Sequence, residues 1–127
     1  MGIFRDFEII SGGNDAIAPT VASATLDENT LSVEFDSIIR NTKISKNRFK
    51  VKVNGKKVRV LSATIEQDDS YVELALQPKN LRTININSSV TLAYMDPKGD
   101  QTSKVVEDVF GNDLDSFSGY GVEIVKF

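Results

Sequence analysis

The strongest constraint on the fold is an Asn-Gly pair that lies between two alternating runs of residues. Asn54 and Gly55 follow residues 49–53 (FKVKV) and precede residues 56–60 (KKVRV), where apolar and basic side chains largely alternate. A two-residue loop of type I′ needs a positive φ at both positions, which Asn and Gly adopt readily, so the pattern predicts a β-hairpin. We expect residues 61–66 to continue its second arm, with a bulge near Ser62.

Further short runs of this kind lie on both sides of the hairpin. They cover residues 20–26, 30–36, 71–77, 90–94 and 121–127, with a short edge strand predicted over 105–110 and a loop with a short helical turn over 78–86. Turn-forming residues separate the runs at intervals of about 8–12 residues, the spacing of β-sandwich strands. The sequence therefore predicts an all-β fold, an immunoglobulin-like β-sandwich of about seven antiparallel strands with Greek-key connections. A small β-barrel is the alternative.

The composition excludes most catalytic chemistry. The 127 residues suit a single domain, and they include no histidine and no cysteine. Disulfides, thiolate or histidine-ligated metal sites, a cysteine nucleophile and a Ser-His-Asp triad are therefore excluded. A glycosidase would need two carboxylates across a cleft, for which so small a domain leaves little room. We expect no enzymatic activity.

The first residues differ in character from the rest of the chain. Residues 3–10 alternate loosely, as a strand would, and residues 11–15 (SGGND) have the composition of a flexible linker. We therefore expect an N-terminal strand and linker over residues 1–13, and a sandwich domain over residues 14–127. The first strand belongs either to a preceding module or to an edge of the same sheet. This segment shows no signal peptide, and no apolar run is long enough to insert into a membrane.

The order of the motifs resembles a known family of repeats. The motifs are NDAIAPT (14–20), ATLDENTL (24–31), FKVKVNG (49–55), VTLAYMDP (90–97), VFGNDL (109–114) and SF (116–117). Together they resemble a repeat of the SwmB type. Such repeats occur in very large cyanobacterial cell-surface proteins, one of which is needed for swimming without flagella, and in other bacterial adhesin-like proteins.

The resemblance implies a role as well as a fold. It implies an immunoglobulin- or cadherin-like sandwich arranged in tandem, an extracellular location at the cell surface, and no known enzymatic activity. The chain is then expected to be a structural and interaction module, adhesin- or motility-associated, whose partners are neighbouring domains of the same protein. The hairpin is more basic than the Thr/Ser/Val-rich repeats typical of this family, which favours a role beyond that of an inert spacer.

Acidic residues in the last third of the chain raise the question of a Ca²⁺ site. The candidate ligands are Asp96, Asp100, Asp108, Asp113 and Asp115, with Glu107 and Asn112 nearby in the sequence. Asp15, in the linker, is a candidate to join a site shared between modules. Calcium takes six or more oxygen ligands, which loops at one end of a sandwich can supply. The alternative is that these residues form turns through side-chain to backbone hydrogen bonds. No Asp-x-Asp-x-Asp-Gly loop is present.

A basic face is the second candidate. Between Asp36 and Glu66 no acidic residue occurs, while the basic residues are Arg40, Lys43, Lys46, Arg48, Lys50, Lys52, Lys56, Lys57 and Arg59. Lys50, Lys52, Lys57 and Arg59 are predicted to share a solvent face of the hairpin that attracts acidic polysaccharide, lipopolysaccharide or an acidic neighbouring module. The alternative is that lysines protect a sheet edge from aggregation. The net charge of −3 argues against nucleic acid.

Tyrosines offer only a weak signal for carbohydrate stacking. The three are Tyr71, Tyr94 and Tyr120, and there is no tryptophan. Tyr94 follows the core-facing side of its run, where it could occupy the position of a tyrosine corner.

Overall fold

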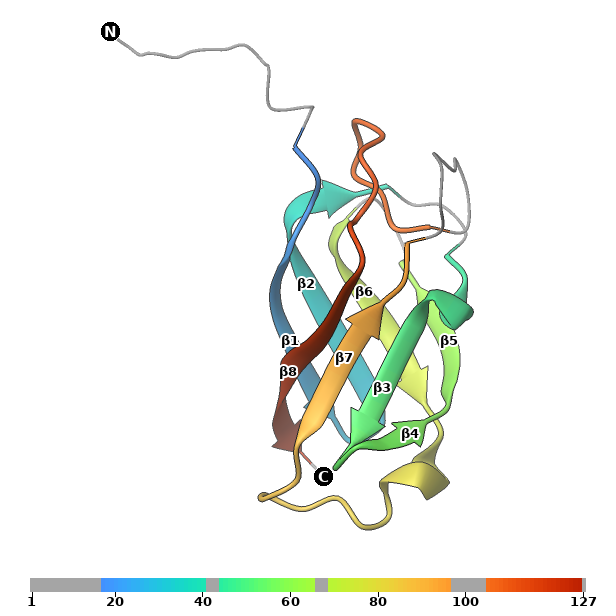
Figure 1. Cartoon of the computed structure of the whole chain (residues 1–127), viewed down its shortest axis with the longest axis vertical. Helices are drawn as coiled ribbons and strands as arrows, with labels where there is room; N and C mark the ends of the chain where they lie inside the picture. Colours follow the sequence, from blue (N-terminus) through green and yellow to red (C-terminus); the bar gives the residue numbers. More distant parts are fainter. Residues whose placement is uncertain (1–16, 41–43, 66–68, 97–104, 127) are drawn as a thin grey trace, which may run out of the picture.

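The computed structural model describes residues 17–40, 44–65, 69–96 and 105–126 and shows an all-β protein (Figure 1). The strand predicted over residues 3–10, the linker over 11–15 and the domain boundary after residue 13 lie outside these ranges. Short 3₁₀ helices, η2 (Lys46–Arg48) and η3 (Pro78–Leu81), interrupt the loops. The second of them confirms the predicted helical turn. None of the described helices is long and apolar enough to cross a membrane.

The strands form two layers that face each other across the core (Figure 1). One layer holds, in spatial order, β1 (Val21–Asp27), β2 (Thr30–Ile39), β6 (Asp69–Leu76) and β5 (Val60–Thr64). The other layer holds β4 (Lys56–Val58), β3 (Phe49–Val53), β7 (Val90–Tyr94) and β8 (Phe117–Lys126). The connections from β2 to β3, from β4 to β5 and from β6 to β7 pass between the layers, as Greek-key connections do. The predicted immunoglobulin-like sandwich is confirmed.

Strand β8 joins the two layers, because its two halves pair with different neighbours. Its first half pairs antiparallel with β7, from Phe117 opposite Tyr94 to Val122 opposite Val90. Its second half pairs parallel with β1. The order of strands therefore runs without a break through eight strands. The structure adds one strand to the predicted number, and one of the pairings is parallel rather than antiparallel.

The hairpin around Asn54 and Gly55 forms as predicted. Their φ angles are 51° and 82°, and β3 pairs with β4 on either side of the turn. The second arm ends at Val58, however, so the prediction that residues 61–66 continue it was wrong. The backbone of Arg59 bonds instead to the segment that follows β6, and β5 pairs with β6 in the opposite layer. The predicted bulge near Ser62 is present in that pairing.

The core follows the alternation of the strands. In β3, Phe49, Val51 and Val53 are buried while Lys50 and Lys52 are exposed. The same alternation buries every second side chain along β7 and, as far as Phe35, along β2. The inner faces of both layers meet in one cluster of buried residues. Each fully buried Val, Leu or Phe stabilises the fold by about 1.5–3 kcal/mol relative to an exposed one, so this cluster holds the layers together.

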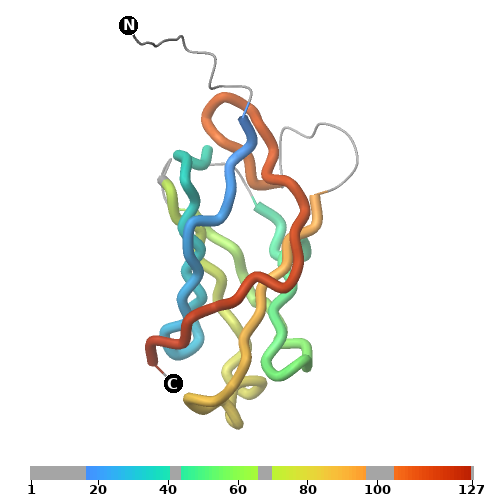
Figure 2. Tube along the Cα trace, turned by 60° about the vertical axis from the view of Figure 1, so that its left-hand side comes forward, coloured from blue at the N-terminus to red at the C-terminus, as the bar shows by residue number. Residues whose placement is uncertain are grey.

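The two ends of the sandwich are reached by different parts of the chain. Because β1 and β8 run in the same direction, β1 begins at one end of the long axis and β8 ends at the other (Figure 1). The first end, here named the N-terminal pole, carries residues 17–20, the end of β2 and residues 105–116. The second end, named the C-terminal pole, carries the β1–β2 and β3–β4 turns and residues 77–89. The tube in Figure 2 shows the same separation from another side.

Candidate interaction surfaces

The loop between residues 108 and 112 at the N-terminal pole is closed by one buried carboxylate. Asp108 is 2% exposed and accepts hydrogen bonds from the backbone N–H of Phe110 at 3.0 Å and of Asn112 at 2.8 Å. The side-chain amide of Asn112 donates a third bond at 3.1 Å. Gly111 permits the tight turn, because its φ of 89° is one that other residues rarely adopt. The loop is therefore held in one conformation from within.

An ion pair between the half-exposed Arg40 and the buried Glu107 attaches this loop to the end of β2. Arg40 Nη1 lies 3.0 Å from Oε1 of Glu107, whose side chain is 3% exposed. Arg40 also donates from Nη2 to the carbonyl of Val109 at 3.2 Å, and its own N–H donates to the carbonyl of Glu107 at 2.9 Å. Removing Arg40 would leave the buried carboxylate of Glu107 without its counter-charge, so this contact favours the observed loop position.

Tyr94 fixes the start of the same loop. Its side chain is 2% exposed, and its ring centroid lies 5.1 Å from that of Phe49. The buried N–H of Val106 donates to the Tyr94 hydroxyl at 2.9 Å, and burial raises the pKa of this tyrosine to about 12. The core-facing prediction is confirmed. The tyrosine corner is not, because there the hydroxyl bonds back to earlier residues, whereas Tyr94 binds a residue 12 positions later.

Residues 105–110 do not form the predicted edge strand. Residues 105–108 are buried, and their pairing is limited to isolated bridges, one of which joins Ile39 and Asp108. The buried polar contacts of Glu107 and Asp108 draw the segment inward, so that it covers the end of the core instead of extending a sheet. The two residues that follow, Val109 and Phe110, are exposed at the tip of the loop.

Only part of the candidate Ca²⁺ ligand set can be placed in the structure. Asp100 and Asp15 lie outside the described residues. Among the residues that the structure describes, no three carboxylates are placed to hold a metal ion. Asp96 is fixed through its backbone N–H, which donates to Ser116 Oγ at 2.8 Å. The bonds to Asp108 support the turn-forming interpretation, and a calcium site stays a prediction.

The hairpin lysines do share an outer face. Lys50, Lys52 and Lys57 are exposed, and Lys52 lies directly opposite Lys57 across the β3–β4 pair. Lys50 and Lys52 border a shallow hollow of about 650 Å³ over β7 and β8, and Lys50 and Lys57 border a smaller one of about 280 Å³ with Arg59. The four predicted residues therefore line a common region of the surface.

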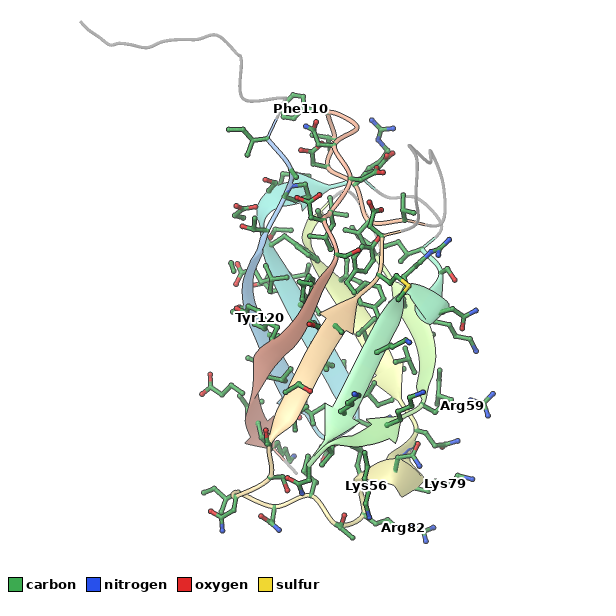
Figure 3. The ribbon with its side chains drawn as sticks, viewed as in Figure 1. Lys56, Arg59, Lys79, Arg82, Phe110 and Tyr120 are labelled. Carbon is green, nitrogen blue, oxygen red and sulfur yellow. The ribbon has the colours of Figure 1, made fainter. Side chains whose placement is uncertain are left out.

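The C-terminal pole carries a second set of basic side chains. Lys56, Arg59, Lys79 and Arg82 are exposed and lie toward this end of the molecule (Figure 3). Asn80 Oδ1 accepts from the N–H of Arg59 at 3.0 Å and so joins the hairpin to η3. Sequence reasoning missed Lys79 and Arg82 because they lie outside the hairpin. The acid-free stretch over residues 74–95 was the signal that could have revealed them.

The N-terminal pole presents acids and exposed apolar side chains. Thr20 donates to Asp36 from its backbone N–H at 2.9 Å and from Oγ1 at 2.7 Å, and these bonds lower the pKa of that carboxyl below its usual range. Phe110 is 66% exposed, and Figure 3 places it at the far end from the basic residues of the C-terminal pole. Ile17 and Ile38 are also exposed. The two poles thus differ in charge.

Comparisons with known proteins concern a repeat family and a surface-layer protein. Residues 14–99 match the SWM repeat family, described as "Putative flagellar system-associated repeat". The N-terminal part of the bacterial S-layer protein SbsC has a similar fold, with a TM-score of 0.62 and 14% identity over 85% of this chain and 24% of that chain. For surface layer protein SbsC, domains 1–6, the TM-score is 0.63 at 14% identity over 85% and 14%. No curated protein sequence matches.

Proposed function

Because the chain belongs to the SWM repeat family, we propose that it is a non-catalytic structural and interaction module of a large bacterial cell-surface protein, adhesin- or motility-associated. In this proposal the chain is one unit of a tandem array, and its partners are the neighbouring domains of the same polypeptide. The absence of histidine and cysteine from the sequence supports a non-catalytic role.

The observation that carries the proposal is the placement of β1 and β8. Since the chain enters the sandwich at one pole and leaves it at the other, units of this kind can be joined end to end along their long axes. The chain spans a quarter or less of the solved SbsC chains that it matches. One of those chains comprises domains 1–6, and 14% of it is close to the share of one domain in six.

The size of the native polypeptide tests the proposal. An antibody raised against the purified chain is used to probe an immunoblot of whole cells of the source organism. We expect a band many times larger than the 14.0 kDa of this chain. A band at the size of the chain, recovered from the soluble extract, would show a free-standing protein and would end the proposal.

A second candidate function is binding of acidic glycans or other polyanions through the hairpin face. Lys52 and Lys57 oppose each other directly on that face, and like charges in this position destabilise a sheet. This loss of sheet stability is explained if an anionic ligand neutralises the two lysines. Acidic polysaccharide and the phosphates of lipopolysaccharide are the two sources of such charge.

The ligand is tested with heparin and with purified lipopolysaccharide in NMR titrations. We expect shifts of the amides of Lys50, Lys52 and Lys57, weaker at higher salt because the charges are exposed and screened. The triple variant K50Q/K52Q/K57Q should lose these shifts, whereas the control K126Q, which removes one lysine outside the hairpin, should keep them. Unchanged amide spectra of residues 50–59 at low salt would exclude this function.

A further inference from the structure

We infer that two copies of this module dock head to tail, with Phe110 of one copy seated in an apolar hollow at the C-terminal pole of the other. The inference rests on the proposed function, because it describes how consecutive units of the array would meet. It goes further in naming the surfaces on both sides and in predicting that free copies of the chain recognise each other.

The projecting side is the loop tip at the N-terminal pole. Val109 and Phe110 are 37% and 66% exposed, although the residues that precede them are buried. The carboxylate of Asp108 and the ion pair of Glu107 hold the loop from below. A rigid aromatic side chain loses little conformational entropy on binding, which is why such residues dominate the energetics of interfaces. Two buried acids thus hold the loop in the position that exposes the phenyl ring of Phe110 to solvent.

The receiving side is a hollow at the opposite pole. It has a volume of about 230 Å³ and is lined by Pro78, Leu81 and Ile84 from the η3 region and by Glu28 and Asn29 from the β1–β2 turn. Three of these five residues are apolar. The turn is fixed in place, because the N–H of Glu28 donates to the carbonyl of Lys126 at 2.8 Å. A preformed apolar hollow suits an apolar side chain such as that of Phe110.

The charges around the two surfaces are complementary. At the N-terminal pole, Asp36 and Asp115 are exposed and Asp113 is partly exposed, while the basic side chain of Arg40, which lies against the loop tip, is paired with Glu107. Lys79 and Arg82 flank the hollow from the same segment that lines it, and Figure 3 shows both at that end of the molecule. The acid within the hollow is already paired, since Glu28 Oε2 lies 3.4 Å from Lys126 Nζ. Opposite charges of this kind set orientation and suppress wrong pairings.

The topology makes such a contact repeatable. The two surfaces lie at opposite poles, so the contact is heterologous and each copy can use both of its poles at once. A single small contact gives weak association between free copies. In one polypeptide the linked neighbour is present at an effective concentration in the millimolar range, which raises the occupancy of the same contact. The contact therefore stiffens an array of linked modules, but it is too weak to make free modules precipitate.

The absence of cysteine from the chain permits a directional cross-linking test. Val109→Cys marks the loop tip, and Thr83→Cys, at an exposed position between Arg82 and Ile84, marks the rim of the hollow. Each protein is mixed at about 1 mM, the range of tethered modules, and oxidised. We expect a disulfide-linked dimer from the mixture of the two variants. The control is Ala22→Cys, on the exposed outer side of β1, which should not cross-link with Thr83→Cys.

Further variants separate specific docking from chance collision. Phe110→Ala in the Val109→Cys chain should slow cross-linking about tenfold, as expected for an aromatic anchor, whereas Leu61→Ala, at an exposed position in β5, should leave the rate unchanged. K79E/R82E should slow it, and higher salt should do the same. Melting curves verify that each variant is folded. Equal rates with the Ala22→Cys control, dimers of Val109→Cys with itself, or no dimer would overturn the inference, whereas the immunoblot decides the tandem proposal separately.

Discussion

At the scale of single residues, three buried polar side chains shape the N-terminal pole. Tyr94 accepts a hydrogen bond from the N–H of Val106, and Asp108 accepts hydrogen bonds from N–H groups of its own loop. Glu107 forms an ion pair with Arg40. The segment that follows Val105 pairs with its neighbours only through isolated bridges. Each of these three side chains makes a further polar contact that holds this segment in place. Buried polar groups without partners are costly, so these contacts specify one position for residues 105–116.

Replacing Tyr94 by Phe is expected to destabilise the protein without changing its fold. The substitution keeps the ring that packs on Phe49 but leaves the N–H of Val106, a fully buried residue, without its acceptor. An unsatisfied buried donor costs about 1–3 kcal/mol of unfolding free energy. Urea denaturation measures this loss. Tyr120→Phe, at a half-buried position, is the control and should cost no more than about 0.5 kcal/mol.

The hydroxyl of Tyr94 also predicts how stability depends on alkaline pH. Its pKa is raised to about 12 in the folded protein, against about 10 in an unfolded chain. Between these values the unfolded state has released the proton and the folded state still holds it. Stability therefore falls as pH rises from about 10 to 12, by about 2–3 kcal/mol from this group. The difference between wild type and Tyr94→Phe isolates the effect, and identical pH slopes would contradict it.

At the scale of elements, a turn that neighbouring residues determine could be predicted from the sequence. A strand end that distant hydrogen bonds determine could not. The β3–β4 turn could be predicted because Asn54 and Gly55 satisfy a requirement for positive φ that lies within two residues. The end of β4 could not, because it depends on bonds from the backbone of Arg59 to Asn80 and Gln77. These partners lie about 20 residues further along the chain and carry no local signal.

The residues of the candidate surfaces also fall into those that the sequence predicted and those that it did not. Alternation along β3 correctly placed Lys50 and Lys52 on the outer face. Lys79 and Arg82 joined the basic residues only through the folded position of η3, and Phe110 became exposed only because the segment before it turned inward. A pattern of spacings reports which face a strand residue takes. It does not report which loops meet at one end of a sandwich.

Replacing Gly55 by Ala tests the hairpin turn. The φ of 82° at this position costs a residue with a side chain about 1–2 kcal/mol. The matched control is Gly121→Ala in β8, where an added Cβ meets no atom within 4 Å and no positive φ is required. We expect a lower urea midpoint for Gly55→Ala and an unchanged or higher one for the control. An equal response of both variants would argue against strain at the turn.

At the scale of the whole molecule, the parallel β1–β8 pairing is the feature on which the proposed function depends. It sends the chain in at one pole and out at the other, and it leaves a different surface at each. The SWM repeat family and the fold shared with SbsC fit the use of such a unit in a surface protein.

A thermal melt with calcium and again with chelator tests the predicted ligand set of Asp96, Asp100, Asp108, Asp113 and Asp115. Both side-chain oxygens of Asp108 already accept bonds from its own loop. We therefore expect the same melting midpoint in both conditions. Binding to the folded state alone would stabilise it by about 2.7 kcal/mol at a calcium concentration 100 times the dissociation constant. A clear rise with calcium would confirm the predicted metal site.

The most direct test of the surface role is antibody labelling of intact cells. Cells of the source organism are labelled with an antibody against the purified chain, before and after permeabilisation, and the free chain is added as competitor. We expect labelling of intact cells that the competitor abolishes and that permeabilisation does not increase. Labelling that appears only after permeabilisation would place the protein inside the cell and contradict its role as a surface module.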